Sequence, residues 1–87
     1  VHGGALFSLA DNGMGGAIHQ TLSDDEISAS IEIKMSYFRA VWDGELICKA
    51  RIVKRGKKVV FAEADIFNNE KLVAKATGSF SIFLPRK

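Results

Sequence analysis

The second half of the chain alternates apolar and polar residues in three successive stretches, and this pattern limits the folds open to it. Residues 45–54, 59–67 and 72–84 each place apolar side chains at every second position. A period of two is typical of a β-strand with one buried face. Short polar turns separate the stretches, so together they predict an antiparallel meander. Residues 27–38 alternate in the same way and predict a further strand.

The apolar side of these strands is small in its middle. Six small residues share it: Ala50, Ala62, Ala64, Ala74, Ala76 and Gly78. A sheet face without large side chains can receive a helix closely. The first twenty residues supply that helix, because they are rich in Gly and Ala and apolar over most of a helical circumference. We therefore predict an α+β fold, with a curved antiparallel sheet wrapped around one central helix.

Strand register follows from the requirement that apolar positions pair with apolar ones. Three-residue loops in both hairpins meet this requirement and place Ala50 opposite Ala62. They also place Glu63 between Lys49 and Lys75 on the outer face, where opposite charges on neighbouring strands are favourable.

One carboxylate, that of Asp11, lies inside the apolar first segment, at the edge of its buried arc. A carboxylate in a buried helix is either a structural group satisfied by a neighbour or a catalytic one. Gly3 and Gly4 favour the second interpretation, because N–H groups at a helix start lack intrahelical partners and lie at the positive end of the dipole. They predict an oxyanion site with no side chain in the way.

The HGG motif at residues 2–4, followed by a small apolar run to Asp11, resembles the hotdog-fold acyl-CoA thioesterases of the phenylacetate-type (PaaI-like) branch. SYFRA, the RGK hairpin and FNNEKLVAKATGSFSI resemble the same family, so the likeness covers residues 1–87 in order. It implies a single hotdog domain that hydrolyses a thioester to a free acid and CoA. Family members usually carry a further helix and a first strand before HGG, and this chain resembles such a domain without that front part.

The separation of Gly3 and Asp11 predicts a homodimer. Eight residues span about 12 Å of helix axis, yet both groups must lie within roughly 3 Å of one reacting centre. Two antiparallel helices across a two-fold axis can set Gly3 of one chain beside Asp11 of its partner, giving two equivalent sites. A hydrophobic fraction of 47% in 87 residues also favours oligomerisation. The resemblance implies a dimer of dimers.

The expected chemistry is thioester hydrolysis. The Gly3 N–H, with Gly4 beside it, polarises the carbonyl, and Asp11 acts as general base or as nucleophile, both of which the sequence leaves open. Ser30 corresponds by resemblance to a family position near the catalytic water, although strict alternation places it on the polar face of its strand. By resemblance His2 orders the loop into the helix.

Four basic residues crowd one hairpin: Lys54, Arg55, Lys57 and Lys58. One interpretation is a solvated turn. The other, which the resemblance favours, is an electrostatic handle for the phosphates of CoA. Arg39 and the two basic residues at the end of the chain are weaker candidates for that role.

Composition excludes several other functions. Most aromatic residues occupy apolar strand or helix positions and the net charge is only +2, so we expect no nucleic-acid partner. No stretch is long and apolar enough for a membrane span and no signal peptide is recognisable, so we expect no membrane association. Cys48 is the single cysteine, which fits a reducing, cytoplasmic location, and we expect a buried, unreactive thiol.

We expect no metal and no cofactor beyond the CoA of the substrate. The alternative function is a non-catalytic acyl-CoA-binding or regulatory hotdog module, against which Asp11 argues. A hotdog dehydratase or hydratase would need a His with an acid in another arrangement, and the sequence contains no convincing counterpart. The acyl group stays open.

Overall fold

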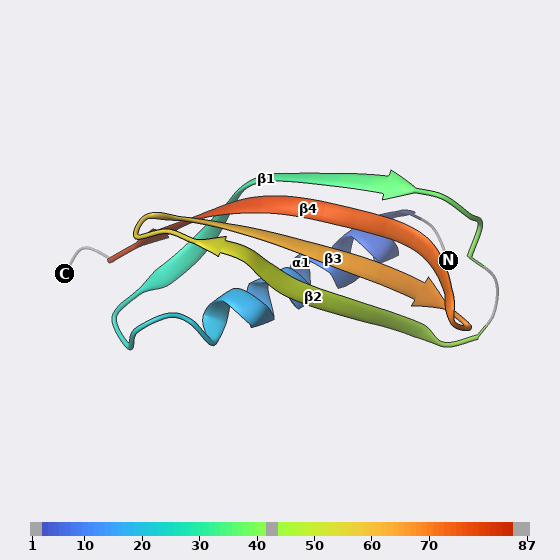
Figure 1. The fold of residues 1–87 in the computed structure, drawn as a ribbon, viewed down its shortest axis with the longest axis horizontal. Coiled ribbons are helices and arrows are strands. Elements are labelled where there is room, and N and C mark those ends of the chain that lie inside the picture. The colour runs from blue at the N-terminus through green and yellow to red at the C-terminus, as the bar shows by residue number, and fades with distance from the viewer. Residues whose placement is uncertain (1–2, 42–43, 85–87) are drawn as a thin grey trace.

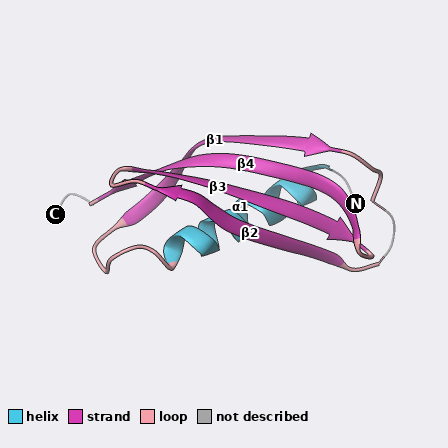
Figure 2. Ribbon diagram, in the orientation of Figure 1, coloured by secondary structure: helices cyan, strands magenta, loops and turns pink. Residues whose placement is uncertain are grey.

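One helix lies against one face of a four-stranded antiparallel sheet in the computed structural model, which describes residues 3–41 and 44–84 (Figure 1). The elements in chain order are α1 (Gly3–His19), β1 (Ile27–Tyr37), β2 (Leu46–Arg55), β3 (Val59–Asn68) and β4 (Lys71–Phe83). Figure 2 shows the loops confined to the two ends of this arrangement. The α+β prediction is confirmed. His2, Arg86 and Lys87 lie outside the described residues.

The strand order is β1-β4-β3-β2, with every neighbouring pair antiparallel. The last three strands form the predicted meander. After β1 at one edge of the sheet, the chain crosses to β2 at the opposite edge. β1 therefore pairs with β4, and both β1 and β2 are edge strands. The sequence did not indicate where β1 would pair.

The core lies between the helix and the small side of the sheet. Leu6, Ala10, Met14 and Ile18, spaced four residues apart along α1, are all buried. On the sheet, Gly78 receives Met14 closely, since a Cβ atom built on Gly78 would lie 3.3 Å from the Met14 Sδ. Burying a side chain of this size stabilises the fold by roughly 1.5–3 kcal/mol. The small-residue patch therefore admits the helix, as predicted.

Three β-bulges set the register, and the predicted register is wrong by two residues. Ala50 pairs with Ala64 rather than with Ala62. The hairpins turn over two residues each, at 57–58 and 69–70, instead of three. Such turns pair odd with even positions, and one extra residue in a strand then restores apolar-to-apolar pairing. The extra residues are Val53 in β2 and Val73 in β4, with a third, Ile31, in β1.

The shifted register changes which acidic residue lies between the cations of the outer face. Asp65, not Glu63, pairs with both Lys49 and Lys75. Its carboxylate accepts hydrogen bonds from the Lys75 Nζ and the Arg51 Nη1, each at 3.0 Å. Burial alone would raise the Asp65 pKa, but these two hydrogen bonds, together with the charges of Arg51 and Lys75, outweigh it and hold the pKa below its usual value.

Candidate active site

The helix begins at Gly3, with Gly4 in the same first turn. The first N–H groups of an α-helix have no acceptor within it, and the helix dipole is positive there. No acidic side chain occupies this first turn. The backbone at Gly3 and Gly4 thus has the polarity that a developing oxyanion requires.

Asp11 is half-buried on the helix, and its carboxylate has no hydrogen-bond or ion-pair partner among the described residues. Its direction follows from Gly13, whose Cβ position would lie 2.8 Å from the Cys48 Sγ on β2. Two residues of α-helix turn by about 200°, so Asp11 faces away from β2. A Cβ atom at Gly15, on the Asp11 side of the helix, would meet nothing within 4 Å. This flank of the helix is open.

Phe7 lies midway between Gly3 and Asp11, four residues from each, on the same stripe of the helix. Phe7 is 39% exposed, whereas the large apolar residues Leu6, Met14 and Ile18 of the same helix are buried. Gly3 and Asp11 are separated by about 12 Å along one helix. A single chain therefore presents the two predicted site groups at either end of an exposed aromatic side chain and does not bring them together.

Ser30 lies on the helix-facing side of β1, so its predicted place on the polar outer face is wrong. It pairs with Phe80, which is buried on the inner side of β4, and directly opposed residues share a face. The bulge at Ile31 reverses the alternation, so that Ile33 and Met35 face inward after it while Ser30 does so before it. Ser30 is exposed in the single chain, on the edge strand.

The four basic residues of the hairpin do not share one surface in the fold. Lys54 pairs with Phe61 and shares its outer face. Arg55 is held by Glu26, with Nη2 to Oε1 at 3.3 Å, and by the Thr21 hydroxyl at 3.2 Å. The Glu26 pKa is lowered, first by the hydrogen bond from the Ser23 N–H and further by the charge of Arg55. Arg55 is thus engaged within the chain.

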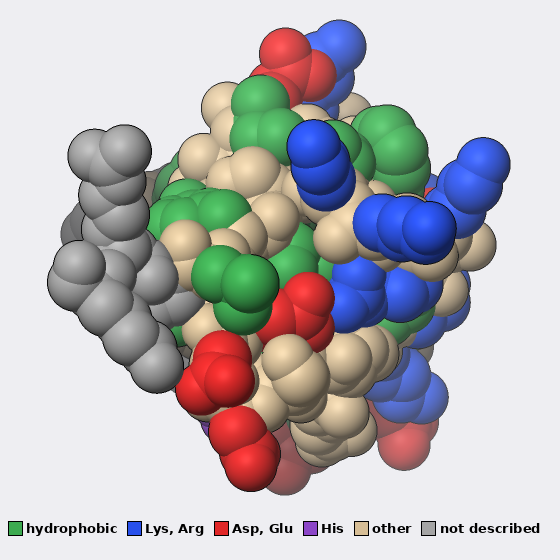
Figure 3. Space-filling model, turned by 90° about the vertical axis from the view of Figure 1, so that its left-hand side faces the viewer, with side chains coloured by type: hydrophobic (Ala, Val, Ile, Leu, Met, Phe, Trp, Pro, Cys, Tyr) green, Lys and Arg blue, Asp and Glu red, His purple; other side chains and the backbone are tan. Residues whose placement is uncertain are grey.

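Lys57 and Lys58 remain directed to a cavity of about 500 Å³ at this end of the sheet. Its other lining residues are Glu26, Ile82, Phe83 and Leu84. Figure 3 views the molecule from this end and shows Lys and Arg side chains gathered on one part of the surface, close to hydrophobic ones. Cations beside apolar side chains suit a ligand that carries both phosphate and an organic ring. Of the four predicted CoA-binding residues, the fold brings these two together.

Cys48 faces the helix and is half-buried. Burial, and secondarily the charge of Asp65, raise the pKa of its thiol. The thiolate is the reactive form of cysteine. A raised pKa therefore fits the expectation that this thiol is no nucleophile.

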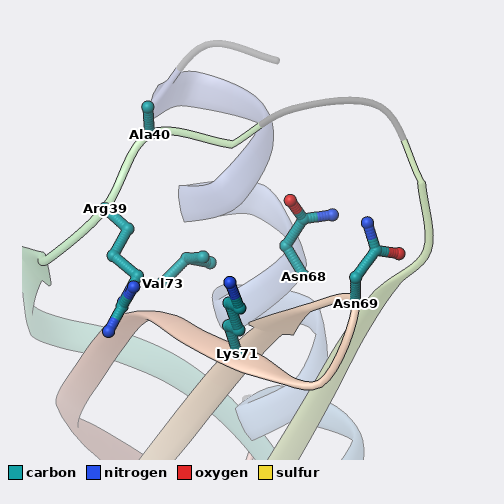
Figure 4. A pocket seen from close by; sticks show the side chains of 6 residues that line it. All are labelled: Arg39, Ala40, Asn68, Asn69, Lys71 and Val73. Atoms are coloured by element: carbon teal, nitrogen blue, oxygen red, sulfur yellow. The ribbon is translucent and has the colours of Figure 1, made fainter.

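Another cavity, of about 260 Å³, lies at the helix-start end of the sheet (Figure 4). Its lining residues are Arg39, Ala40, Asn68, Asn69, Lys71 and Val73. Sequence reasoning gave Arg39 only a weak role and missed Lys71. The spacing of the two residues carried no signal, because their proximity arises from the pairing of β1 with β4.

Within the described ranges, no group of three or more His, Cys, Asp or Glu side chains is placed to hold a metal ion. In the same ranges, the helix is too short and insufficiently apolar to cross a membrane.

Comparison with known proteins yields a family and a fold. Residues 1–75 match the model of a family described as "Thioesterase superfamily". Over 83 residues the chain is 30% identical to a Pseudomonas aeruginosa protein named "Putative esterase", covering 94% of this chain and 62% of the relative. The chain spans 50 to 62% of the length of the four curated relatives that it matches.

Solved structures share the architecture. A conserved protein of Pseudomonas aeruginosa is 43% identical, with a TM-score of 0.90 over 95% of this chain and 66% of that one. A Bacillus halodurans protein solved with CoA is 30% identical, with a TM-score of 0.91 over 95% and 59%. A phenylacetic acid degradation-related protein of Ralstonia eutropha, described as a "putative thioesterase", is 28% identical, with a TM-score of 0.90 over 93% and 61%. These likenesses confirm the hotdog fold.

Proposed function

Because the chain belongs to the thioesterase superfamily, we propose that it hydrolyses acyl-CoA thioesters at two equivalent sites of a homodimer. The observation that carries this proposal is the Asp11 carboxylate, which is half-buried, without a partner among the described residues, and on the open flank of a helix that begins with two glycines. Burying a carboxylate without a partner costs stability, and active sites are where such placements are kept.

The dimer places the reactive groups together. If the two helices run antiparallel with Gly3 beside Asp11 of the partner subunit, the two-fold axis passes the helices midway, at Phe7. The exposed Phe7 side chain then meets its own copy, as an isologous interface requires. This pairing gives the exposed aromatic a burial site and supports the antiparallel arrangement.

In the water route, Asp11 of the partner subunit removes a proton from water while the water oxygen bonds to the thioester carbon. The carbonyl electron pair moves to oxygen, where the Gly3 N–H stabilises the negative charge. When the carbonyl re-forms, the C–S bond breaks and the thiolate takes the proton from the carboxyl group. In the nucleophile route, the carboxylate itself bonds to the carbon and the thiolate leaves. Water then hydrolyses the anhydride to the free acid, and the proton left on Asp11 passes to the thiolate, which restores the carboxylate.

Ser30 lies on the helix side of β1, and the Asp11 flank of the helix faces away from β2. Both placements are consistent with Ser30 lying near the catalytic water and helping to position it. Lys57 and Lys58 would hold phosphates of CoA, a role in keeping with the apolar and cationic lining of their cavity.

The finer features of the proposal have separate support. The likeness to a phenylacetic acid degradation-related protein supports the phenylacetate-type branch.

Exposed Val53 and Phe61, which line a cavity of about 360 Å³ on the outer face of the sheet, support a dimer of dimers. Cys48 has no second cysteine with which to form an internal disulfide, which supports a reducing, cytoplasmic location. We propose that residues 1–87 act as one domain.

The decisive experiment measures release of free thiol from a panel of aromatic and aliphatic acyl-CoAs. Asp11→Asn is expected to lower turnover by about 10²-fold or more, the scale for loss of an acid–base group. Asp24→Asn, which changes an exposed loop carboxylate, is the matched control and should keep full turnover. A folded dimer that binds acyl-CoA but releases no thiol would instead support the non-catalytic binding module.

A further inference from the structure

We propose that the cavity lined by Arg39 and Lys71 binds a phosphate monoester. It lies at the end of the sheet opposite the Lys57–Lys58 turn, near the start of α1 (Figures 1 and 4). The described lining of this cavity contains neither Gly3 nor Asp11, and its binding of a phosphate monoester does not depend on thioester hydrolysis.

The fold holds the two cations together from different strands. Phe38 and Arg39 both donate their N–H groups to the Val73 carbonyl, at 2.8 and 3.3 Å. Val73 is the extra residue of the β4 bulge, so its carbonyl can receive both donors. This contact ties Arg39, which follows β1, to the beginning of β4, where Lys71 is the first residue.

A tight turn fixes the other wall of the cavity. Asn69 and Glu70 have φ angles of 51° and 71°, which is the conformation of a two-residue hairpin turn. The turn pairs Asn68 with Lys71, and opposed residues share a face, so Lys71 is on the side of the buried Asn68. The Asn68 Nδ2 donates to the Glu45 carbonyl at 3.1 Å, which anchors this wall. In the view of Figure 4, the Lys71 side chain lies between Arg39 and the two asparagines.

The charge of the cavity is unbalanced. Among the described residues, neither Arg39 nor Lys71 has a carboxylate partner, whereas Arg51 has two and Arg55 and Lys75 have one each. The lining residues that the structure describes include no acid. Arg39 and Lys71 are both exposed, so water weakens the repulsion between their charges, and an anion between them is attracted to both.

The composition of the cavity favours phosphate over carboxylate. A phosphate monoester carries about −1.5 to −2 charges at pH 7 and three acceptor oxygens, which matches two cations. Arg39 can donate two parallel hydrogen bonds to two of the oxygens, while Lys71 supplies a point charge. A volume of about 260 Å³ suits one phosphate group and its ester carbon rather than a whole nucleotide, because pockets for drug-sized ligands measure about 300–1,000 Å³.

The test is a titration of isotopically labelled protein with inorganic phosphate and then with AMP, followed by NMR at low ionic strength, with NaCl at matched ionic strength as reference. We expect saturable shifts at residues 68–71 and at Arg39. Lys71→Gln and Arg39→Gln should each weaken binding about tenfold, as expected for loss of one charge-assisted hydrogen bond. Lys49→Gln, which removes a charge from the outer face, should bind as the wild type does.

The proposal is overturned if phosphate causes no more shift than NaCl, or if Lys49→Gln weakens binding as much as Lys71→Gln. Arg39→Lys guards against misfolding, since it keeps the charge and should bind with intermediate affinity. A kinetic arm identifies the source of the monoester. If it is the 3′-phosphate of CoA, Lys71→Gln raises KM for an acyl-CoA but not for its 3′-dephospho analogue. If it is a separate ligand, phosphate shifts persist at saturating CoA. An inactive protein would leave the NMR titration interpretable.

Discussion

Gly13 of α1 lies directly against Cys48 of β2, so that a Cβ atom on Gly13 would fall 2.8 Å from the Cys48 Sγ. Carbon and sulfur do not approach so closely without displacement of one of them. The helix therefore rests on β2 at a distance that requires glycine. This close approach also turns Asp11 toward the opposite, open flank.

Substituting the helix glycines separates the effect of this contact on stability from the effect of helix propensity. Gly16→Ala should stabilise the protein by up to about 1 kcal/mol, because nothing lies within 4 Å of its Cβ position and alanine favours helix. Gly13→Ala should lose that gain and destabilise by about 1–3 kcal/mol through overpacking. Urea unfolding measures both. In a Cys48→Ala background the penalty at Gly13 should shrink, and a Gly13→Ala protein as stable as Gly16→Ala would contradict the contact.

A charge at Phe7 should disrupt the proposed dimer. Phe7→Glu places two like charges at the two-fold axis, while the fold of each chain tolerates the change because Phe7 is 39% exposed. Sedimentation over a range of concentrations should show a smaller assembly that lacks the helix-to-helix dimer, and thiol release per chain should fall as that dimer is lost. Ile47→Glu, at a residue of similar exposure on the outer face, is the control and should keep the helix-to-helix dimer and its thiol release. Dimeric, active Phe7→Glu would exclude the antiparallel arrangement.

Lys57 and Lys58 should contribute to substrate binding, whereas Arg55 should contribute to stability. Replacing Lys57 and Lys58 by Gln should raise KM for acyl-CoA several-fold with kcat unchanged, the signature of lost uniform binding. Arg55→Gln should instead lower the urea midpoint, because Arg55 is bound to Glu26 and Thr21. Steady-state kinetics and urea unfolding of the same preparations separate the two effects. An Arg55→Gln protein with normal stability and raised KM would reverse the assignment.

Stability should depend on pH through Asp65. The folded-state pKa of Asp65 is lowered from its ordinary value of 3.8, so this carboxylate stabilises the fold above that pH. The stabilisation is lost as the pH falls through the lower folded-state value, because the unfolded chain takes up the proton first. Urea midpoints should decline below about pH 4. Asp65→Asn should flatten that decline, and Asp24→Asn should not. An identical decline in both variants would point to other carboxylates.

The fold was predictable because periodicity and side-chain size act over long stretches. The alternation in residues 45–84 and the small patch around Ala64 indicated both the sheet and the helix that it receives. It was also predictable that apolar positions pair with apolar positions on neighbouring strands, since one face of the sheet must be buried. What failed was the register: the turn at 69–70 and the extra residue Val73 shift pairing in ways that apolar spacing does not record.

The candidate site was partly predictable for the same reason. Gly3 and Asp11 could be named because a helix start and a lone carboxylate are local features. The face of Ser30 could not, since the bulge at Ile31 reverses it. Nor could the meeting of Arg39 and Lys71, which depends on β1 crossing to pair with β4.

The three bulges also bear on how relatives of this chain should be aligned. A residue gained or lost at Ile31, Val53 or Val73 reverses which side chains face inward on one side of that position only. A change of one residue in the next turn can restore the original alternation. One-residue insertions and deletions among homologous sequences should therefore gather at these strand positions as well as in the loops. An alignment that forces every gap into a turn would assign Ser30 and its neighbours to the wrong face of the sheet.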